Sequence, residues 1–403
     1  MEVGNPRRGV SEMEKLRFDT PIDRYHTDSV KFDFKKEYGK EEGVLPLWVA
    51  DTDFAIPKEA ADAIRKRAEH PLYGYSAGDA SYYDSLREWM KTRHGYEIQN
   101  DWVINTPSVV FAMVIAIRKF TKEGEAVMIQ TPVYGQFYKT VVNNHRELVE
   151  VPLLQDKAKE NGYEMDFAKI EQLIVERNVK AFLLCNPHNP VGRVWTKQEL
   201  TRLGDILIRH DVRIISDEIH MDLAYPGYKH IVFASLKEEF AKNTITCTAP
   251  TKVFNIAGLQ QANIIISEKE LRDQFRQEVH STGYMEPNIF GMIASRECYA
   301  HGAEYVDELI RYVSKNVSYV TEFVKENMPK ARVIKPEGMY LLWIDFSGYG
   351  YEKDELVRRI EHVAKLWLND GEAFGVEGRG YMRINLATTL ATVKEACERM
   401  LLI

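Results

Sequence analysis

Long hydrophobic runs are missing from this sequence, and so is an excess of positive charge. No window approaches the roughly 18 consecutive apolar residues that a membrane-spanning helix needs, so we expect no membrane segment. Lys and Arg total 53 against 60 Asp and Glu, which gives a net charge of −7. The chain therefore lacks the basic field that non-specific nucleic-acid binding requires, and we expect neither a membrane nor a nucleic acid as its partner.

Cysteine is scarce, and its spacing is unlike that of a zinc site or a disulfide framework. The four cysteines form no CxxC pair and no Cys/His cluster, so we expect reduced, buried thiols and no metal site. The stretch 1–15 carries several charges and no apolar core of a secretory signal. Together these features predict a cytoplasmic location.

The composition is that of a globular protein with more than one lobe. At roughly 150 residues per domain, 403 residues correspond to two or three lobes, and 45% apolar residues exclude a disordered chain. Short, nearly continuous apolar runs alternate with helical patterns, which is typical of a mainly parallel sheet covered on both faces. The predicted class is therefore α/β. The predicted strand runs are 126–129, 181–185, 212–216, 245–248 and 262–266.

The pattern changes after about residue 296. A long helical pattern over 304–328 and two later apolar runs, 340–344 and 381–385, predict a smaller α+β domain. We predict three parts: an N-terminal segment (1–55) that packs with the small domain, a large domain (56–295) and a small domain (296–403).

Two helix starts are also predicted from local signals. Thr196-Lys197-Gln198-Glu199 has the form of a capping box. Thr106-Pro107 reads as an N-cap followed by proline at the first helical position.

Polar residues follow three of the predicted strands directly. The segment 186–192 contains Asn189, the segment 217–220 begins with Asp217, and the segment 249–252 ends with Lys252. Ligands of open α/β sheets bind outside the carboxyl ends of the strands, so an amide, a carboxylate and an amine are expected to converge there. Each also has an ordinary interpretation, as a turn residue, a helix cap or a solvated lysine.

Taken together, these segments resemble the landmarks of fold-type-I pyridoxal-phosphate enzymes. The resemblance is strongest to their carbon–sulfur β-lyase branch and covers nearly the whole chain. The sequence departs from the usual pattern at Thr52, where the branch usually has Met, and at Ser108, where it usually has Gly. Gln260 stands where many aminotransferases place a phosphate-binding Arg. The matching motifs are LPLWVADTDF (45–54), NPHNPVGRVW (186–195), SDEIH (216–220), TKVFNIAG (251–258) and RINLA (383–387).

The resemblance implies a fold-type-I transferase fold with pyridoxal 5'-phosphate as cofactor. Lys252 then carries the cofactor covalently and later acts as the base that removes the substrate's Cα proton. Asp217 pairs with the ring nitrogen, Asn189 binds the ring hydroxyl close to the substrate, and Tyr134 stacks on the ring. His220 occupies a position near the cofactor that is often Tyr in related aminotransferases, although a single histidine there is more often structural.

The phosphate requires hydrogen-bond donors, and the helix start near Pro107 offers them. Backbone N–H groups there favour an anion, which assigns Ser108, Val109 and Val110 to the phosphate. A hydroxyl from Thr248 or Thr251 is a further donor, and the sequence leaves that choice open.

Two more residues are expected to contact the substrate, and one of them comes from a second subunit. Arg383 is expected to hold the α-carboxylate of an amino acid with two parallel hydrogen bonds. Tyr75 resembles a residue that reaches the phosphate and substrate of the neighbouring subunit, which implies a homodimer with shared active sites.

The leading functional hypothesis is a lyase that cleaves a carbon–sulfur bond at Cβ of an L-amino acid. The products are pyruvate, ammonia and a thiol. An aminotransferase is the nearest alternative, because it uses the same lysine and the same ring chemistry. A regulatory protein-binding role on the same fold is a second alternative, which loss of Lys252 would leave intact.

Overall fold

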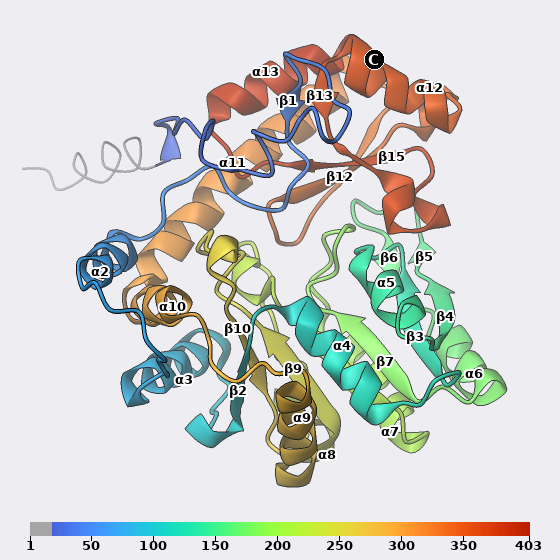
Figure 1. Ribbon diagram of the computed structural model, residues 1–403. Coiled ribbons are helices and arrows are strands. Elements are labelled where there is room, and N and C mark those ends of the chain that lie inside the picture. The colour runs from blue at the N-terminus through green and yellow to red at the C-terminus, as the bar shows by residue number, and fades with distance from the viewer. Residues whose placement is uncertain (1–17) are drawn as a thin grey trace, which may run out of the picture.

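The computed structural model describes residues 18–403 (Figure 1). The stretch 1–15, where a secretory signal is not expected, lies outside the described residues. A seven-stranded sheet forms the centre of the larger lobe. Strand β10 pairs antiparallel with both β2 and β9, and the other four pairings are parallel, which confirms the mainly parallel sheet. In spatial order the strands are β2 (Val103–Thr106), β10 (Ala262–Ile265), β9 (Thr244–Thr248), β8 (Arg213–Asp217), β7 (Ala181–Cys185), β3 (Ala126–Thr131) and β4 (Glu147–Pro152).

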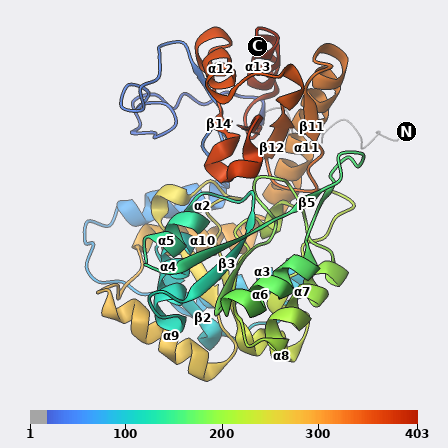
Figure 2. The ribbon, with the colours of Figure 1, turned by 90° about the vertical axis from the view of Figure 1, so that its right-hand side faces the viewer.

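Helices cover both faces of this sheet, as Figure 2 shows. Every residue of β3, β7 and β9 is buried, which explains why these strands read as continuous runs rather than as alternating patterns. One face carries α4 (Val109–Phe120), α5 (Gln136–Val142) and α9 (Lys269–Ser281), and the other carries α6 (Phe167–Arg177), α7 (Lys197–Arg209) and α8 (Glu238–Asn243).

One predicted helix start is confirmed and the other is wrong. Thr196 and Glu199 form the capping box of α7. Helix α4, however, begins two residues later than predicted, with Ser108 as its N-cap. Thr106 is still the last residue of β2, and the hydroxyl of Ser108 accepts the N–H of Phe111 at 3.1 Å. The sheet pairing holds Thr106 in the strand, so the next residue with a capping side chain takes the role.

The smaller lobe lies above the seven-stranded sheet in Figures 1 and 2 and has the predicted α+β character. Its four-stranded sheet is antiparallel throughout. The strands, in spatial order, are β11 (Arg332–Ile334), β12 (Leu341–Asp345), β15 (Tyr381–Asn385) and β14 (Asn369–Asp370); the helices are α11 (Ala303–Asn327), α12 (Lys353–Arg358) and α13 (Leu390–Met400).

Residues 18–55 of the N-terminal segment run along the smaller lobe. Its strand β1 (Leu45–Pro46) pairs in parallel with β13 (Leu366–Trp367). The predicted boundary at residue 295 falls inside α10 (Ile289–His301), a helix that packs on α2 (Lys58–Ala68) and α3 (Ala80–His94). A short hairpin, β5 (Leu154–Gln155) and β6 (Tyr163–Glu164), completes the strands.

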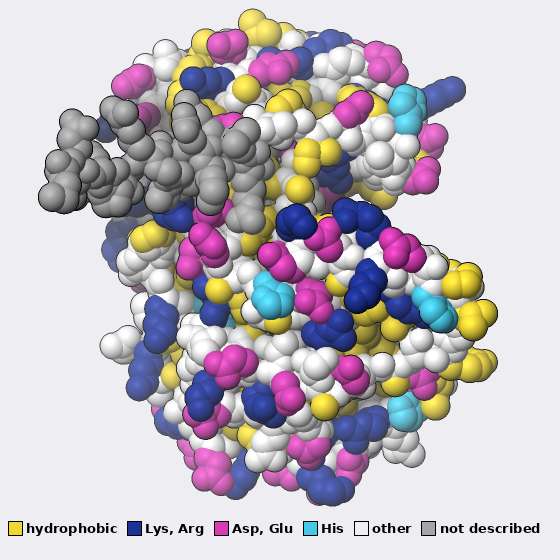
Figure 3. Space-filling model, turned by 90° about the vertical axis from the view of Figure 1, so that its left-hand side faces the viewer, with side chains coloured by type: hydrophobic (Ala, Val, Ile, Leu, Met, Phe, Trp, Pro, Cys, Tyr) yellow, Lys and Arg dark blue, Asp and Glu magenta, His cyan; other side chains and the backbone are white. Residues whose placement is uncertain are grey.

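The surface and the thiols agree with the composition. On the face in Figure 3, acidic and basic side chains are interspersed. All four cysteines are free and buried, as expected. None of the helices within residues 18–403 has the length and apolar character needed to cross a membrane.

Candidate active site

A cavity of about 400 Å³ brings the predicted site residues together. All of them except Tyr75 line it, although they come from strand ends, loops and a helix start in both lobes. Those that line the cavity are Ser108, Val109, Val110, Tyr134, Asn189, Asp217, His220, Thr251, Lys252 and Arg383.

Lys252 lies just beyond β9, where its amine is held by the backbone of the N-terminal segment. Its Nζ donates a hydrogen bond to the carbonyl oxygen of Ala50 at 2.9 Å. The hydroxyl of Tyr340 donates to the same oxygen at 3.2 Å. Burial lowers the pKa of Lys252 below its ordinary value. A larger share of this amine is therefore neutral near pH 7, the form that attacks a carbonyl or accepts a proton.

Asp217 ends β8 and presents a carboxylate with few partners. Its Oδ1 accepts the backbone N–H of Ile219 at 3.1 Å, and no cation of the described chain forms an ion pair with it. Burial raises the pKa of Asp217 to about 7. A protonated ring nitrogen is the kind of donor that such a carboxylate lacks.

His220 lies close by and is neutral. Burial lowers its pKa to about 3, and its buried Nδ1 has no hydrogen-bond partner within residues 18–403. Its ring meets that of Tyr340 edge-on.

Arg383 is a buried guanidinium surrounded by neutral acceptors. Nη1 donates to Asn189 Oδ1 at 3.1 Å, and Nη2 donates to the carbonyl of Trp48 at 3.0 Å and to Asn369 Oδ1 at 2.5 Å. Its Nε is buried, and residues 18–403 provide no hydrogen-bond partner for it. Within the described residues no carboxylate pairs with Arg383, and burial lowers its pKa to about 10. An unpaired, desolvated cation of this kind favours binding of an anion.

The first turn of α4 borders the cavity. The first N–H groups of a helix have no intrahelical acceptor, and Val109 and Val110 are the first two residues of α4. The Ser108 hydroxyl accepts from Phe111 and keeps its own proton for a ligand. Of the two threonines left open, Thr251 lines the cavity, whereas the Thr248 hydroxyl donates to the carbonyl of Asn263 at 3.3 Å.

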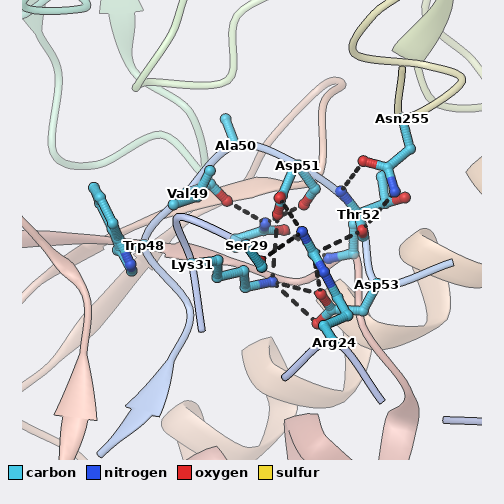
Figure 4. Close-up of polar contacts among 12 residues, drawn as sticks. Arg24, Ser29, Lys31, Trp48, Val49, Ala50, Asp51, Thr52, Asp53 and Asn255 are labelled. Carbon is cyan, nitrogen blue, oxygen red and sulfur yellow. Dashed lines mark hydrogen bonds and ion pairs between the residues drawn. The ribbon is translucent and has the colours of Figure 1, made fainter. Parts of the chain in front are cut away.

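The backbone that holds Lys252 and Arg383 is itself fixed by an ion quartet, which we define as Arg24, Lys31, Asp51 and Asp53 (Figure 4). Arg24 pairs with Asp51 at 2.6 Å and with Asp53 at 2.7 Å, while Lys31 pairs with Asp53 at 2.9 Å. The two carboxylates of the quartet, Asp51 and Asp53, follow directly after Trp48 and Ala50 in the chain. The quartet therefore secures the peptide whose carbonyls meet both site cations.

Three features escaped or departed from the sequence prediction. Tyr75 is fully exposed and does not line the cavity of its own chain. Asn369 was not predicted, because its only signal is the pairing of β14 with β15, which places it opposite Arg383. The carbonyl of Ala50 was missed because sequence patterns do not reveal which backbone groups face a site.

Comparison with known proteins decides the family. Residues 42–400 match the family described as aminotransferase class I and II. The chain belongs to this family. It is 38% identical to cystathionine beta-lyase PatB of Bacillus subtilis, covering 96% of this chain and 99% of that protein. It is 30% identical to protein MalY of Escherichia coli, covering 91% and 93%.

A solved structure gives the same assignment. Cystalysin of Treponema denticola, which contains pyridoxal 5'-phosphate, superposes with a TM-score of 0.91, at 39% identity, over 95% of this chain and 97% of that one. The fold is therefore that of fold-type-I pyridoxal-phosphate enzymes.

The residues of the cavity fit that cofactor. A buried carboxylate that accepts a hydrogen bond, an amine that can attack a carbonyl and a helix N-terminus that donates N–H groups are what a pyridinium ring, an aldehyde and a phosphate require. Lys252, Asp217 and the first turn of α4 supply these three groups around one cavity.

Proposed function

We propose that this protein is a pyridoxal-phosphate-dependent carbon–sulfur β-lyase. The observation that carries the proposal is the convergence of Lys252, Asp217, Asn189 and Arg383 on one cavity. The relatives named cystathionine beta-lyase support the reaction class.

Each residue has a separate task. Pyridoxal phosphate, when bound, supplies a ring that accepts the electron pair left at the substrate's Cα. Arg383 binds the α-carboxylate and orients the Cα–H bond, and Lys252 Nζ takes the Cα proton. Asp217 keeps a proton on the ring nitrogen, and Asn189 binds the ring hydroxyl. The Cβ–S bond then breaks with its electrons on sulfur, and water completes the conversion to pyruvate, ammonia and a thiol.

The reaction is tested by product analysis. S-alkyl cysteines and cysteine are expected to yield pyruvate without any added keto acid, measured with a coupled lactate dehydrogenase assay. An aminotransferase, which uses the same residues, would instead form an amino acid from 2-oxoglutarate with little pyruvate. No pyruvate from any sulfur amino acid would contradict the lyase assignment.

We also propose a homodimer with shared active sites, in a cytoplasmic location. Exposed apolar residues support it: Leu72 is 69% exposed and Tyr73 55%, beside the fully exposed Tyr75. Such residues are typical of a contact surface between subunits. Light scattering is expected to give twice the mass of the 46.6 kDa chain. A monomeric mass at micromolar concentration would contradict the shared site.

A further inference from the structure

The cavity wall has few charged side chains, and the proposed reaction uses each of them. Among the described lining residues, only Asp217, Lys252 and Arg383 carry a charge. They are assigned to the ring nitrogen, the Cα proton and the α-carboxylate. His220 adds none, since burial lowers its pKa to about 3. A charge at the far end of a substrate's sulfur substituent therefore finds no counter-ion in this wall.

The N-terminal segment contributes an apolar part of the wall. Val30 and Trp48 both line the cavity. The indole of Trp48 stacks on Trp367 with ring centroids 4.4 Å apart and meets Tyr38 edge-on at 5.1 Å. These contacts fix the indole, so the cavity meets a preformed apolar surface rather than a mobile side chain.

The cations next to this surface are already neutralised. Lys31, the neighbour of Val30 in the chain, has no exposed side-chain surface and pairs with Asp53. Figure 4 shows its side chain directed into the ion quartet. Lys40 lies 5.6 Å from the ring centre of Trp367 and pairs with Glu361 at 2.5 Å. Neither amine is free to meet an anionic substituent.

The loop of a second subunit that carries Tyr75 would add no charged side chain to the cavity wall. Residues 71–78 read PLYGYSAG and include no charged side chain. A neighbouring copy that reaches the cavity with this loop brings apolar and hydroxyl groups only.

We propose that the site selects cysteine S-conjugates whose sulfur substituent is uncharged, with Val30 and Trp48 as specificity-determining residues. This inference rests on the proposed function and narrows its substrate class. Contact with an apolar wall favours an alkyl or aryl group, whereas a charged group loses its hydration there without gaining a partner. Cystathionine, which carries both an ammonium and a carboxylate on its far side, is then a poor substrate.

Pairs of substrates with the same shape test the proposal. S-propyl-L-cysteine matches S-(2-aminoethyl)-L-cysteine, and S-isobutyl-L-cysteine matches S-carboxymethyl-L-cysteine, apart from charge. The kcat/KM for pyruvate formation is expected to be at least about tenfold higher for the neutral member of each pair, mainly through KM. Equal values within about threefold would overturn the proposal.

A binding experiment separates this inference from the lyase assignment. The same four cysteine conjugates are titrated into cofactor-loaded Lys252→Ala by calorimetry. In each pair, the neutral member is expected to have the lower dissociation constant. If the wild-type protein forms no pyruvate, the lyase assignment fails, while the binding order still supports or overturns the selectivity.

Changing Val30 tests the wall itself. Val30 is 49% exposed, so a longer side chain can be accommodated. Val30→Arg is expected to raise the ratio of kcat/KM for S-carboxymethyl-L-cysteine over S-isobutyl-L-cysteine by about tenfold, with Val30→Gln as the uncharged control of similar reach. An equal ratio in the two variants would overturn the role of Val30.

Discussion

Two groups of charges lie near the same stretch of backbone, 48–53, and they differ in how their charges are paired. In the ion quartet, Arg24 and Lys31 meet two carboxylates at 2.6 to 3.6 Å. In the cavity, Asp217, Lys252 and Arg383 form no ion pair within the described chain. Paired charges stabilise the backbone, whereas unpaired ones are held ready for a ligand. The pairing of charges therefore distinguishes residues that stabilise the fold from residues that act on a ligand, and it does so from this structure alone.

Removing the cavity amine should have the largest effect. Lys252→Ala is expected to lower kcat for pyruvate formation by about 10³-fold or more, because both the covalent attachment and the base are lost. Lys35→Ala is the matched control, since Lys35 is also buried but donates to the hydroxyl of Tyr25 outside the cavity. A similar decrease in kcat in both variants would show that Lys252 stabilises the fold and does not take part in the reaction.

The unpaired carboxylate should destabilise the cofactor-free protein above neutral pH. The pKa of Asp217 is 3.8 when unperturbed and about 7 in the fold. Between these values the folded state binds more protons than the unfolded state, so its stability falls as pH rises. Asp217→Asn removes this penalty and is expected to stabilise the cofactor-free protein by on the order of 2–4 kcal/mol above pH 7.

Thermal unfolding at several pH values checks this prediction. The stabilisation by Asp217→Asn should be absent near pH 4 and reach its full size above pH 7. A gain that does not change with pH would contradict an unpaired carboxylate at this position.

The unpaired guanidinium should matter mainly for substrate binding. Arg383→Gln is expected to raise KM by about 30- to 100-fold, because a charged hydrogen-bonding pair with the α-carboxylate contributes roughly 2–3 kcal/mol. Arg399→Gln is the control, since Arg399 donates to the carbonyls of Gly43 and Lys365 instead. Unchanged KM in Arg383→Gln would remove Arg383 from the carboxylate site.

Substitutions in the ion quartet should have the smallest effect, and this effect should be on stability alone. Lys31→Met is expected to lower the free energy of unfolding by about 1–3 kcal/mol, because the half-buried carboxylate of Asp53 loses a fully buried partner. Lys58→Met breaks the exposed pair with Asp62 and should cost less than about 1 kcal/mol. Denaturant unfolding of both variants measures the difference, and equal effects would contradict a structural role for the buried Lys31.

Sequence reasoning recovered the five inner strands of the sheet, because they are almost wholly buried and read as continuous apolar runs. It did not predict the two edge strands, β2 and β4, and β4 alternates between buried and exposed residues at its end. Sequence reasoning also brought Asn189, Asp217 and Lys252 to one edge of the sheet, since Asp217 ends β8 and the other two residues lie in the loops after β7 and β9. It misplaced the start of α4, because strand pairing at Thr106 outweighed a local capping signal.

The quartet and Asn369 could not be predicted, because they depend on contacts between segments distant in the chain. Arg24 meets Asp51 and Asp53 only once the N-terminal segment has folded back, and Asn369 meets Arg383 through sheet register. Local sequence patterns cannot predict either of these contacts.

The central claim is that the amine of Lys252 carries the cofactor. Borohydride reduction of the holoenzyme, followed by proteolysis and mass spectrometry, tests it most directly. The account predicts a reduced pyridoxyl phosphate group on the peptide containing Lys252. A label on another lysine, or no label in a protein that retains bound cofactor, would contradict it.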